Sequence, residues 1–590
     1  MRALQFVGWV VALSVMLVGC GKEAAKQDAN VSKDDQPLMN EAAENQSDIK
    51  SDPRTSQKTA AKTRAQSARK RTASSASAYG RRAQLSQRIP QIQADSIPPN
   101  PYIGRGSSAP QDAEAGRIGN RYSPIGEGKF QDATKQPLST FSIDVDTASY
   151  AITRRYLLES QRLPPPDAVR IEELVNYFDY VYEPPTDDRP FAAHLEVTGC
   201  PWQPKHRLVR VAIKGKEVHR EQRPAANLVF LVDVSGSMQS SDKLPLVQRG
   251  LRMLVKNLSD DDRVAIVVYA SRTGVVLPST SIDNRRVILS RIDDLSAGGS
   301  TNGGDGIRLA YEQAQENFIK GGTNRVILCT DGDFNVGTTD TKELVNLVKR
   351  KAKGGVYLTA LGFGTGNHND AMMEKVSNDG NGNYFYVDSN SEAQKVFVQE
   401  LSGTLVTIAK DVKIQIEFNP EEVDSYRLIG YENRRLAAKD FNDDKKDAGE
   451  IGAGHTVTAI YEIVPIGAEV DSPAVDRLKY QKVANRVRPK KVNGGELLTL
   501  KIRYKQPDGT KSTKVEYVVK DQGIAFNKAS DEMQFASAVA SFGMLLRNSK
   551  HRGDASYDAV MEVAQASLGQ DKYGRRKEFL EMVRRAKGLR

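Results

Sequence analysis

Three groups of oxygen-bearing side chains recur in the middle of the chain, each with a glycine beside it. They are Asp233-Val-Ser235-Gly-Ser237, then Ser300-Thr301 followed by Asp305-Gly306, then Thr330-Asp331-Gly332. Hydroxyls and carboxylates are the ligands that a hard divalent cation such as Mg²⁺ prefers. The groups contain no histidine or cysteine, which argues against zinc. The sequence therefore predicts a site for a hard cation, provided that the fold brings the three groups together.

The segment that carries these groups, residues 226–402, alternates between two kinds of periodicity. Continuous apolar runs, such as Asn227 to Val232 and Val326 to Cys329, are separated by stretches with an apolar face at helical spacing, such as Leu244 to Leu258. This alternation predicts a doubly wound, mainly parallel α/β sheet with helices on both faces. In such sheets sites form at the carboxyl ends of strands, where the three polar groups fall.

The pattern resembles the von Willebrand factor type A (VWA) domain with its metal-ion-dependent adhesion site, which has D-x-S-x-S, T-x4-G and a strand that ends in T-D-G. In that family the residues equivalent to Ser235, Ser237 and Thr301 bind the metal directly, while those equivalent to Asp233 and Asp331 act mostly through water. The resemblance implies Mg²⁺, with Mn²⁺ or Ca²⁺ as alternatives. It also implies an open coordination position for an Asp or Glu of a partner protein.

Strands with one buried face flank this segment on both sides. Alternating runs occur before it, at 191–197 and 207–213, and after it, at 412–418, 456–463, 497–504 and 515–519. Such runs are typical of antiparallel sheets. We therefore expect the α/β domain to be inserted in an antiparallel β-sandwich, with an N-terminal helical segment and a C-terminal helical region.

The chain begins with a short positive end and an apolar run from Phe6 to Val18, which closes in Leu17-Val18-Gly19-Cys20. This is the anatomy of a secretory signal, too short for a membrane span. The cysteine after a small residue resembles the lipobox of bacterial lipoproteins, which implies lipidation of Cys20. Only Cys200 and Cys329 remain, too few for a disulfide scaffold.

The next segment, from Gly21 to Leu138, is polar and lacks sustained periodicity, so we expect a disordered tether. Residues 54–90 hold ten lysines and arginines and no acid, which equals the formal net charge of +10 of the whole chain. The net positive charge of the chain therefore comes from the tether. An anionic envelope surface fits it better than nucleic acid does.

These observations give six expected parts. They are a signal peptide at 1–20, a tether at 21–138, helices and first sandwich strands at 139–225, the VWA domain at 226–402, sandwich strands at 403–525 and C-terminal helices at 526–590. The lipobox, the tether, the segment FSIDVDTASY, the VWA domain and the long C-terminal region together resemble bacterial lipoproteins of the YfbK type. The resemblance implies a lipid-anchored protein of the cell envelope, in the outer rather than the inner membrane if the source is Gram-negative.

Two enzymatic interpretations compete with the metal site. Asp144-Val-Asp146-Thr147 partly matches the D-x-D-x-T nucleophile motif of haloacid-dehalogenase-type phosphatases, but the threonine comes one position early. Capping of the next helix by Asp146 or Thr147 is the simpler expectation. A nucleophilic Ser235 would need a histidine base, and only His368 lies in the central domain.

The tripeptide Arg552-Gly553-Asp554 occurs as an adhesion motif in other proteins. In this chain Asp554 precedes a predicted helix, so we expect it to cap that helix.

The sequence thus predicts a surface-tethered interaction protein and not an enzyme, which binds an unknown acidic partner protein through Mg²⁺. The alternative is a structural or regulatory envelope scaffold, in which the metal site only braces its loops.

Overall fold

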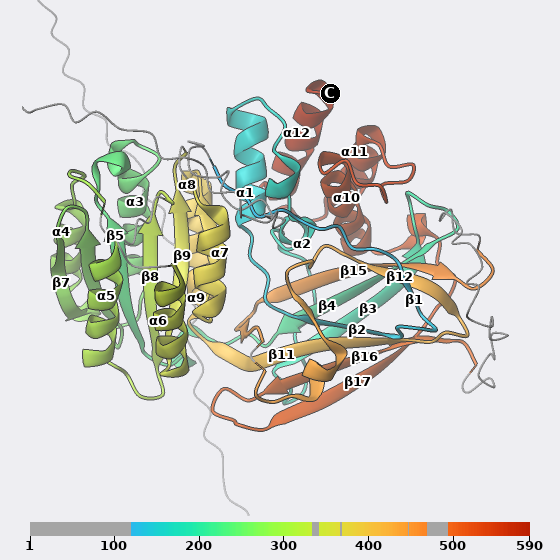
Figure 1. Cartoon of the computed structure of the whole chain (residues 1–590), viewed down its shortest axis with the longest axis horizontal. Coiled ribbons are helices and arrows are strands. Elements are labelled where there is room, and N and C mark those ends of the chain that lie inside the picture. The colour runs from blue at the N-terminus through green and yellow to red at the C-terminus, as the bar shows by residue number, and fades with distance from the viewer. Residues whose placement is uncertain (1–119, 302, 333–340, 366–367, 447, 469–493) are drawn as a thin grey trace, which may run out of the picture. The chain divides into compact units, whose positions relative to one another are not determined.

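A computed structural model describes residues 120 to 590, apart from 302, 333–340, 366–367, 447 and 469–493 (Figure 1). These residues belong to one compact unit. The predicted signal peptide, Cys20 and the tether up to residue 119 lie outside the described residues. Among the helices that are described, none combines the length and the apolar composition needed to span a bilayer.

A six-stranded sheet forms the centre of residues 226–404, here called the α/β part. Its order is β10-β9-β8-β5-β6-β7, with parallel neighbours except for β7, which runs antiparallel to β6. The strands are β5 (Ala226–Asp233), β6 (Arg263–Tyr269), β7 (Thr273–Ser281), β8 (Thr323–Thr330), β9 (Val356–Phe363) and β10 (Tyr384–Val387). Every residue of β5 is buried, because both faces of the sheet are covered.

Helices cover both faces of this sheet (Figure 1). One face packs against α3 (Leu244–Asn257), α4 (Arg285–Asp293), α8 (Asn390–Gln394), the π-helical turn η6 (Lys395–Glu400) and α9 (Leu401–Thr404). The other face packs against α5 (Gly304–Glu316), α6 (Thr341–Lys353) and α7 (Asp370–Asp379). The predicted doubly wound, mainly parallel fold is confirmed.

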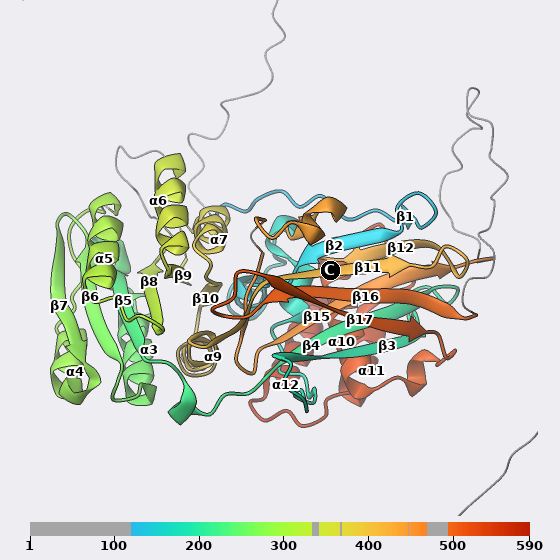
Figure 2. The ribbon, with the colours of Figure 1, turned by 90° about the horizontal axis from the view of Figure 1, so that it is seen from below.

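Two antiparallel sheets face each other across a shared apolar core and form a sandwich (Figure 2). The first contains β1 (Gln131–Asp132), β12 (Val423–Ile429), β15 (Thr456–Pro465), β4 (Arg207–Gly215) and β3 (Phe191–Gly199). The second contains β13 (Arg435–Leu436), β2 (Leu138–Ser142), β11 (Thr407–Phe418), β16 (Glu496–Lys505) and β17 (Ser512–Lys520), with β14 (Ile451–Gly452) paired to β11. Since β4 precedes the α/β part and β11 follows it, that part is inserted in the sandwich, as predicted.

Helices from both ends of the described chain share a further core. They are α1 (Ala148–Arg154), its π-helical continuation η1 (Arg155–Glu159), α2 (Ile171–Val175), α10 (Asp531–Leu546), α11 (Tyr557–Ala566) and α12 (Arg575–Gly588). The ring of Tyr150 stacks on that of Tyr177 at 3.7 Å, and Phe178 packs edge-on against Phe535. Short 3-10 turns occur at η2 (Pro166–Ala168), η3 (Arg220–Gln222), η4 (Gly236–Gln239), η5 (Ile282–Asn284), η7 (Ala438–Asn442) and η8 (Phe526–Lys528).

The folded unit begins earlier than the predicted boundary at residue 138. Gln131 and Asp132 pair with β12, and the backbone N–H of Ala133 donates to the carbonyl of Asp424 at 3.0 Å. The backbone N–H of Arg121 also donates to the carbonyl of His368 at 2.9 Å. These contacts are made by the backbone, so the polar composition of the segment did not indicate them.

Candidate metal site

Neighbouring parallel strands bring two of the predicted groups to one edge of the sheet. Asp233 is the last residue of β5 and Thr330 the last of β8, and the register pairs Val232 with Cys329. Asp331 follows directly after β8. The carboxyl ends of β5 and β8 therefore place both carboxylates at the same edge.

Asp233 is fully buried, and its carboxylate fixes the loop that follows β5. Its Oδ1 atom accepts the backbone N–H of Ser235 at 2.8 Å, and its Oδ2 atom accepts the hydroxyl of Thr330 at 3.4 Å. Burial raises the pKa of this carboxyl, hydrogen bonds from Ser235 lower it, and the nearby charge of Asp331 raises it further. The pKa is raised overall because burial disfavours the charged form, and a cation bound beside Asp233 would offset that cost.

The two serine hydroxyls of the first group converge. Ser235 is buried, Ser237 is exposed, and their Oγ atoms lie 3.0 Å apart. Adjacent ligands of an octahedral ion, each about 2.1 Å from the metal and at right angles, are about 3.0 Å apart. The spacing of these hydroxyls therefore fits Mg²⁺, and the exposure of Ser237 leaves this side of the site open to solvent.

The loop that carries Thr301 is bonded to the Asp233 loop. The backbone N–H of Gly236 donates to the carbonyl of Gly299 at 2.9 Å, and that of Gly298 donates to the carbonyl of Val234 at 2.7 Å. Thr301 is half-buried and lies two residues after Gly299. The structure thus joins the loop of Thr301 to the loop that carries Ser235 and Ser237.

Gly306, which closes the second group, lies where helix α5 meets the sheet. A Cβ atom at this position would lie 3.0 Å from Cβ of Tyr269 and 3.1 Å from Cδ1 of Leu231. Only a residue without a side chain lets α5 approach β5 and β6 so closely.

Lys243 is a residue of this site that the sequence analysis missed. Its Nζ atom donates to Oδ2 of Asp331 at 2.9 Å, and both side chains are largely buried. Lys243 directly precedes α3, so the helix start positions its side chain. A lysine ten residues after Asp233 gave no signal in the sequence, because only the fold brings it to β8.

Arg155, in η1, contacts the same loop from outside the α/β part. Its guanidinium donates to Oδ2 of Asp242 at 2.9 Å and to the hydroxyl of Tyr386 at 2.6 Å. The hydroxyl of Ser240 donates to the other oxygen of Asp242 at 2.5 Å. The segment that follows Ser237 is therefore held by a helix of the N-terminal segment.

His368 does not supply a base for Ser235. It is buried, and its Nε2 atom forms a hydrogen bond with the hydroxyl of Tyr384. Burial lowers its pKa, which favours the neutral ring. Gly332, with φ of +92°, lies against this ring, and a Cβ there would be 2.6 Å from Nδ1. Within the described residues the side chain of Ser235 contacts Asp233 and Ser237, and it forms no hydrogen bond with His368.

A second group of carboxylates lies where the α/β part meets the N-terminal segment and the sandwich. Asp146, Glu173 and Glu374 are buried, with oxygen atoms within 4.8 Å of one another. Arg434 donates to Asp146 at 2.7 Å, and Arg170 donates to Glu374 at 2.8 Å. Since arginines pair with all three of these carboxylates, we interpret the group as a structural charge cluster.

The expected capping role of Asp146 or Thr147 is wrong. Thr147 occupies the N-cap of α1 without a side-chain cap hydrogen bond. Asp146 accepts the backbone N–H of Tyr384 at 2.7 Å instead, across 238 residues of sequence. The phosphatase interpretation of this segment finds no support either, since both oxygens of Asp146 are engaged in these structural contacts.

The expected cap at Asp554 is also wrong. Helix α11 begins at Tyr557, and Ser556 is its N-cap, whose side chain accepts the backbone N–H of Ala559 at 3.2 Å. The backbone N–H of Asp554 donates to the carbonyl of Trp202 at 2.9 Å. The Arg552-Gly553-Asp554 turn is therefore fixed by backbone packing.

Models of known protein families match the α/β part and the region that follows it. Residues 227–400 match the family model of the von Willebrand factor type A domain, and residues 403–589 match that of the C-terminal region of uncharacterized protein YfbK. A further von Willebrand factor model matches residues 117–210.

Individual relatives differ in how much of the chain they share. Uncharacterized protein YfbK of Escherichia coli K12 is 44% identical over 488 residues, which are 81% of this chain and 83% of that protein. Inter-alpha-trypsin inhibitor heavy chain H4 of Homo sapiens is 31% identical over 192 residues, 31% of this chain and 20% of that one. A solved structure, von Willebrand factor type A from Catenulispora acidiphila, covers 67% of this chain and 89% of its own at 14% identity, with a TM-score of 0.38. Given the identity over most of both chains, this protein belongs to the YfbK family and contains a VWA domain.

Proposed function

We propose that the protein binds a partner protein through Mg²⁺ held by Asp233, Ser235, Ser237, Thr301 and Asp331, with an Asp or Glu of the partner completing the coordination. VWA domains commonly bind divalent metals and mediate protein–protein interaction. The observation that carries the proposal is the 3.0 Å separation of the Ser235 and Ser237 hydroxyls beside the buried Asp233. When bound, the ion supplies a Lewis-acidic position for an incoming carboxylate.

The charges of the site favour an acidic ligand. Asp233 and Asp331 supply two negative charges, and Lys243 supplies one positive charge. A divalent cation added to this set leaves an excess of one positive charge. A single carboxylate from outside restores neutrality, which favours an Asp or Glu of a partner over a neutral side chain.

Each residue has a distinct task in this proposal. The hydroxyls of Ser235 and Ser237 offer direct ligands, and Thr301 offers a third from the adjoining loop. Asp233 fixes the first loop through the N–H of Ser235, and Asp331 balances charge together with Lys243. Since one carboxylate contact gives little affinity alone, the surrounding loops must supply the rest.

The proposal includes a place for the protein in the cell. Lipidation at Cys20 would hold it in the cell envelope, at the outer membrane if the source is Gram-negative, as its signal segment suggests. We also propose that the site has no catalytic activity, because Ser235 contacts Asp233 and Ser237 and has no histidine partner within the described residues.

One observation favours the scaffold alternative. The loops of the site are already joined by direct hydrogen bonds, and Lys243 already pairs with Asp331. In that alternative the metal braces the loops, and partners bind the sandwich or the C-terminal helices.

Affinity capture from envelope extracts separates the two functions. The bait is the full chain, and the Asp233→Ala variant and a chelator are the comparisons. A partner lost both with the variant and with EDTA supports metal-dependent binding. A partner kept under both conditions supports the scaffold.

A further inference from the structure

A large cavity lies away from the metal site, between the α/β part and the sandwich. Its volume is about 790 Å³, within the range of about 300–1,000 Å³ typical of small-molecule sites. From the α/β part, Asp379 at the end of α7 and Tyr357 near the start of β9 line it. Since Tyr357 lies near the amino end of its strand, this cavity is at the edge of the sheet opposite to Asp233.

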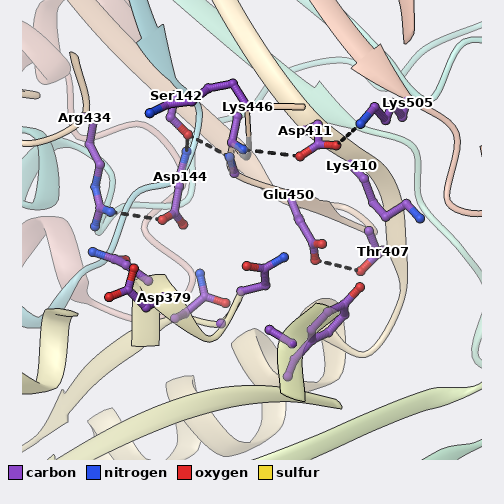
Figure 3. Close-up of a pocket in the computed structure, with 18 of the residues that line it drawn as sticks. Ser142, Asp144, Asp379, Thr407, Lys410, Asp411, Arg434, Lys446, Glu450 and Lys505 are labelled. Carbon is purple, nitrogen blue, oxygen red and sulfur yellow. Dashed lines mark hydrogen bonds and ion pairs between the residues drawn. The ribbon is translucent and has the colours of Figure 1, made fainter. Parts of the chain in front are cut away.

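The cavity carries a surplus of positive charge. Nine lysines and arginines and five carboxylates line it, an excess of four positive charges. Figure 3 shows Asp379 from the α/β part, and the other labelled side chains come from the sandwich and its loops. The excess of positive charge is shared equally, with two charges from the α/β part and two from the sandwich and its loops.

The carboxylates of the cavity are all engaged within the protein. Asp144 pairs with Arg434 at 3.1 Å, Asp379 with Lys349 at 3.0 Å, Asp411 with Lys505 at 2.5 Å and Asp444 with Arg503 at 3.3 Å, and Glu450 accepts the hydroxyl of Thr407 at 3.4 Å. The interactions between labelled residues are drawn in Figure 3. Each carboxylate that lines the cavity thus already has a partner within the protein.

Several cations of the cavity are not engaged in this way. Within the described ranges no hydrogen bond or ion pair joins the side chains of Lys353, Lys410 or Lys445 to another residue. In Figure 3 the ammonium of Lys410 carries no dashed line. A ligand with negative charges would satisfy these groups.

The neutral polar side chains of the cavity favour a sugar as the ligand. Side-chain amides and hydroxyls, namely Asn378, Asn381, Asn383, Asn433, Ser142 and Thr407, contribute to it. The Oδ1 atom of Asn378 is buried and accepts no hydrogen bond from the described residues. Amides and hydroxyls match sugar hydroxyls, whereas the few apolar side chains offer no path for a lipid chain and no row of aromatic rings for stacked bases.

We propose that this cavity binds an acidic saccharide, a short glycan with carboxylate or phosphate groups. Lys410 and Lys445 contact its negative groups, and the asparagines contact its hydroxyls. The site is separate from the metal site and does not depend on it.

Titration calorimetry of the full chain tests the proposal with trigalacturonate and trehalose phosphate as acidic saccharides and maltotriose as the neutral match. We expect binding of at least one acidic probe and none of maltotriose. Lys410→Glu and Lys445→Glu should each weaken binding about tenfold, as expected for the loss of a hydrogen bond to a charged group. Lys577→Glu, an exposed lysine on α12, is the matched control and should bind normally.

Asp233→Ala is expected to leave saccharide binding unchanged, because the metal site lies at the opposite edge of the sheet. The proposal is overturned if neither acidic probe binds, if both Lys410→Glu and Lys445→Glu bind as the wild type does, or if hexaglutamate binds more tightly than both probes. The last result would assign the cavity to an acidic peptide.

Discussion

The ammonium of Lys243 lies 2.9 Å from Oδ2 of Asp331, at the edge of the sheet where a divalent cation is expected. The protein thus places a cation of its own beside one of the two carboxylates of the site. An added metal ion and this lysine repel each other and share Asp331. For the proposed metal site we therefore expect the affinity to depend on Lys243 as well as on the five predicted residues.

Replacement of Lys243 by methionine is expected to tighten Mg²⁺ binding about tenfold, because a positive charge near the ion is removed. Titration calorimetry at fixed ionic strength measures the dissociation constant. Lys256→Met, at an exposed position of the same helix, is the control and should bind Mg²⁺ as the wild type does. Unchanged or weaker binding by Lys243→Met would show that the lysine does not compete with the ion.

Replacement of Ser237 by alanine is expected to weaken Mg²⁺ binding about tenfold or more, because one direct ligand is lost. Ser237 is exposed, so the melting temperature without metal should stay the same. Thermal unfolding with and without Mg²⁺ measures both effects. Ser241→Ala, an exposed serine nearby, is the control. A full Mg²⁺-dependent rise in melting temperature for Ser237→Ala would exclude Ser237 as a ligand.

Glu172 makes stability depend on pH. It is buried in α2, and its Oε2 atom has no hydrogen-bond partner among the described residues. Burial, then the nearby charge of Glu432, raises its pKa to about 7 from the ordinary value of 4.5. The raised value means that Glu172 contributes stability that is fully present below pH 4.5 and is lost as the pH rises through 7.

The unfolding free energy of the wild type is therefore expected to fall by on the order of 3 kcal/mol between acid and neutral pH. Glu172→Gln should not show this fall, because its side chain does not ionise. Denaturant unfolding at several pH values measures this, with Glu562→Gln at an exposed position of α11 as the control. If wild type and Glu172→Gln lose stability equally as the pH rises, the carboxyl is not protonated in the folded protein at acid pH.

Arg154 joins three parts of the fold. Its guanidinium donates to Asp388 and Glu392 of the α/β part, each at 2.9 Å, and to Glu578 of α12 at 3.0 Å. Arg154→Met should destabilise the protein by about 3–5 kcal/mol, because buried carboxylates lose their cation. Arg584→Met, in an exposed pair with Glu581, should cost about 0.5 kcal/mol or less. Equal denaturation midpoints for the two variants would contradict this role.

Local patterns were sufficient to predict the α/β sheet, its insertion in the sandwich and the approach of the Asp233 and Asp331 loops. Apolar strands and amphipathic helices leave a periodic signal, and oxygen ligands at strand ends follow from it. Contacts between residues that are far apart in the sequence leave no such periodic signal. Arg154 meets Asp388 across 234 positions, and Asp146 meets Tyr384 across 238. Neither pairing is visible in any window of sequence, and the same holds for Lys243, whose role depends on how α3 begins.

Ligation by Thr301 and lipidation of Cys20 remain predictions. Thr301 lies in the loop whose Gly299 carbonyl accepts the backbone N–H of Gly236. Cys20 lies outside the described residues.

The insertion of the α/β part has a mechanical consequence. Its two chain connections lead to β4 and β11, which lie in different sheets of the sandwich. If a partner binds at the Asp233 edge as proposed, a pulling force on it would be divided between these two connections. Both sheets of the sandwich would then carry part of the load.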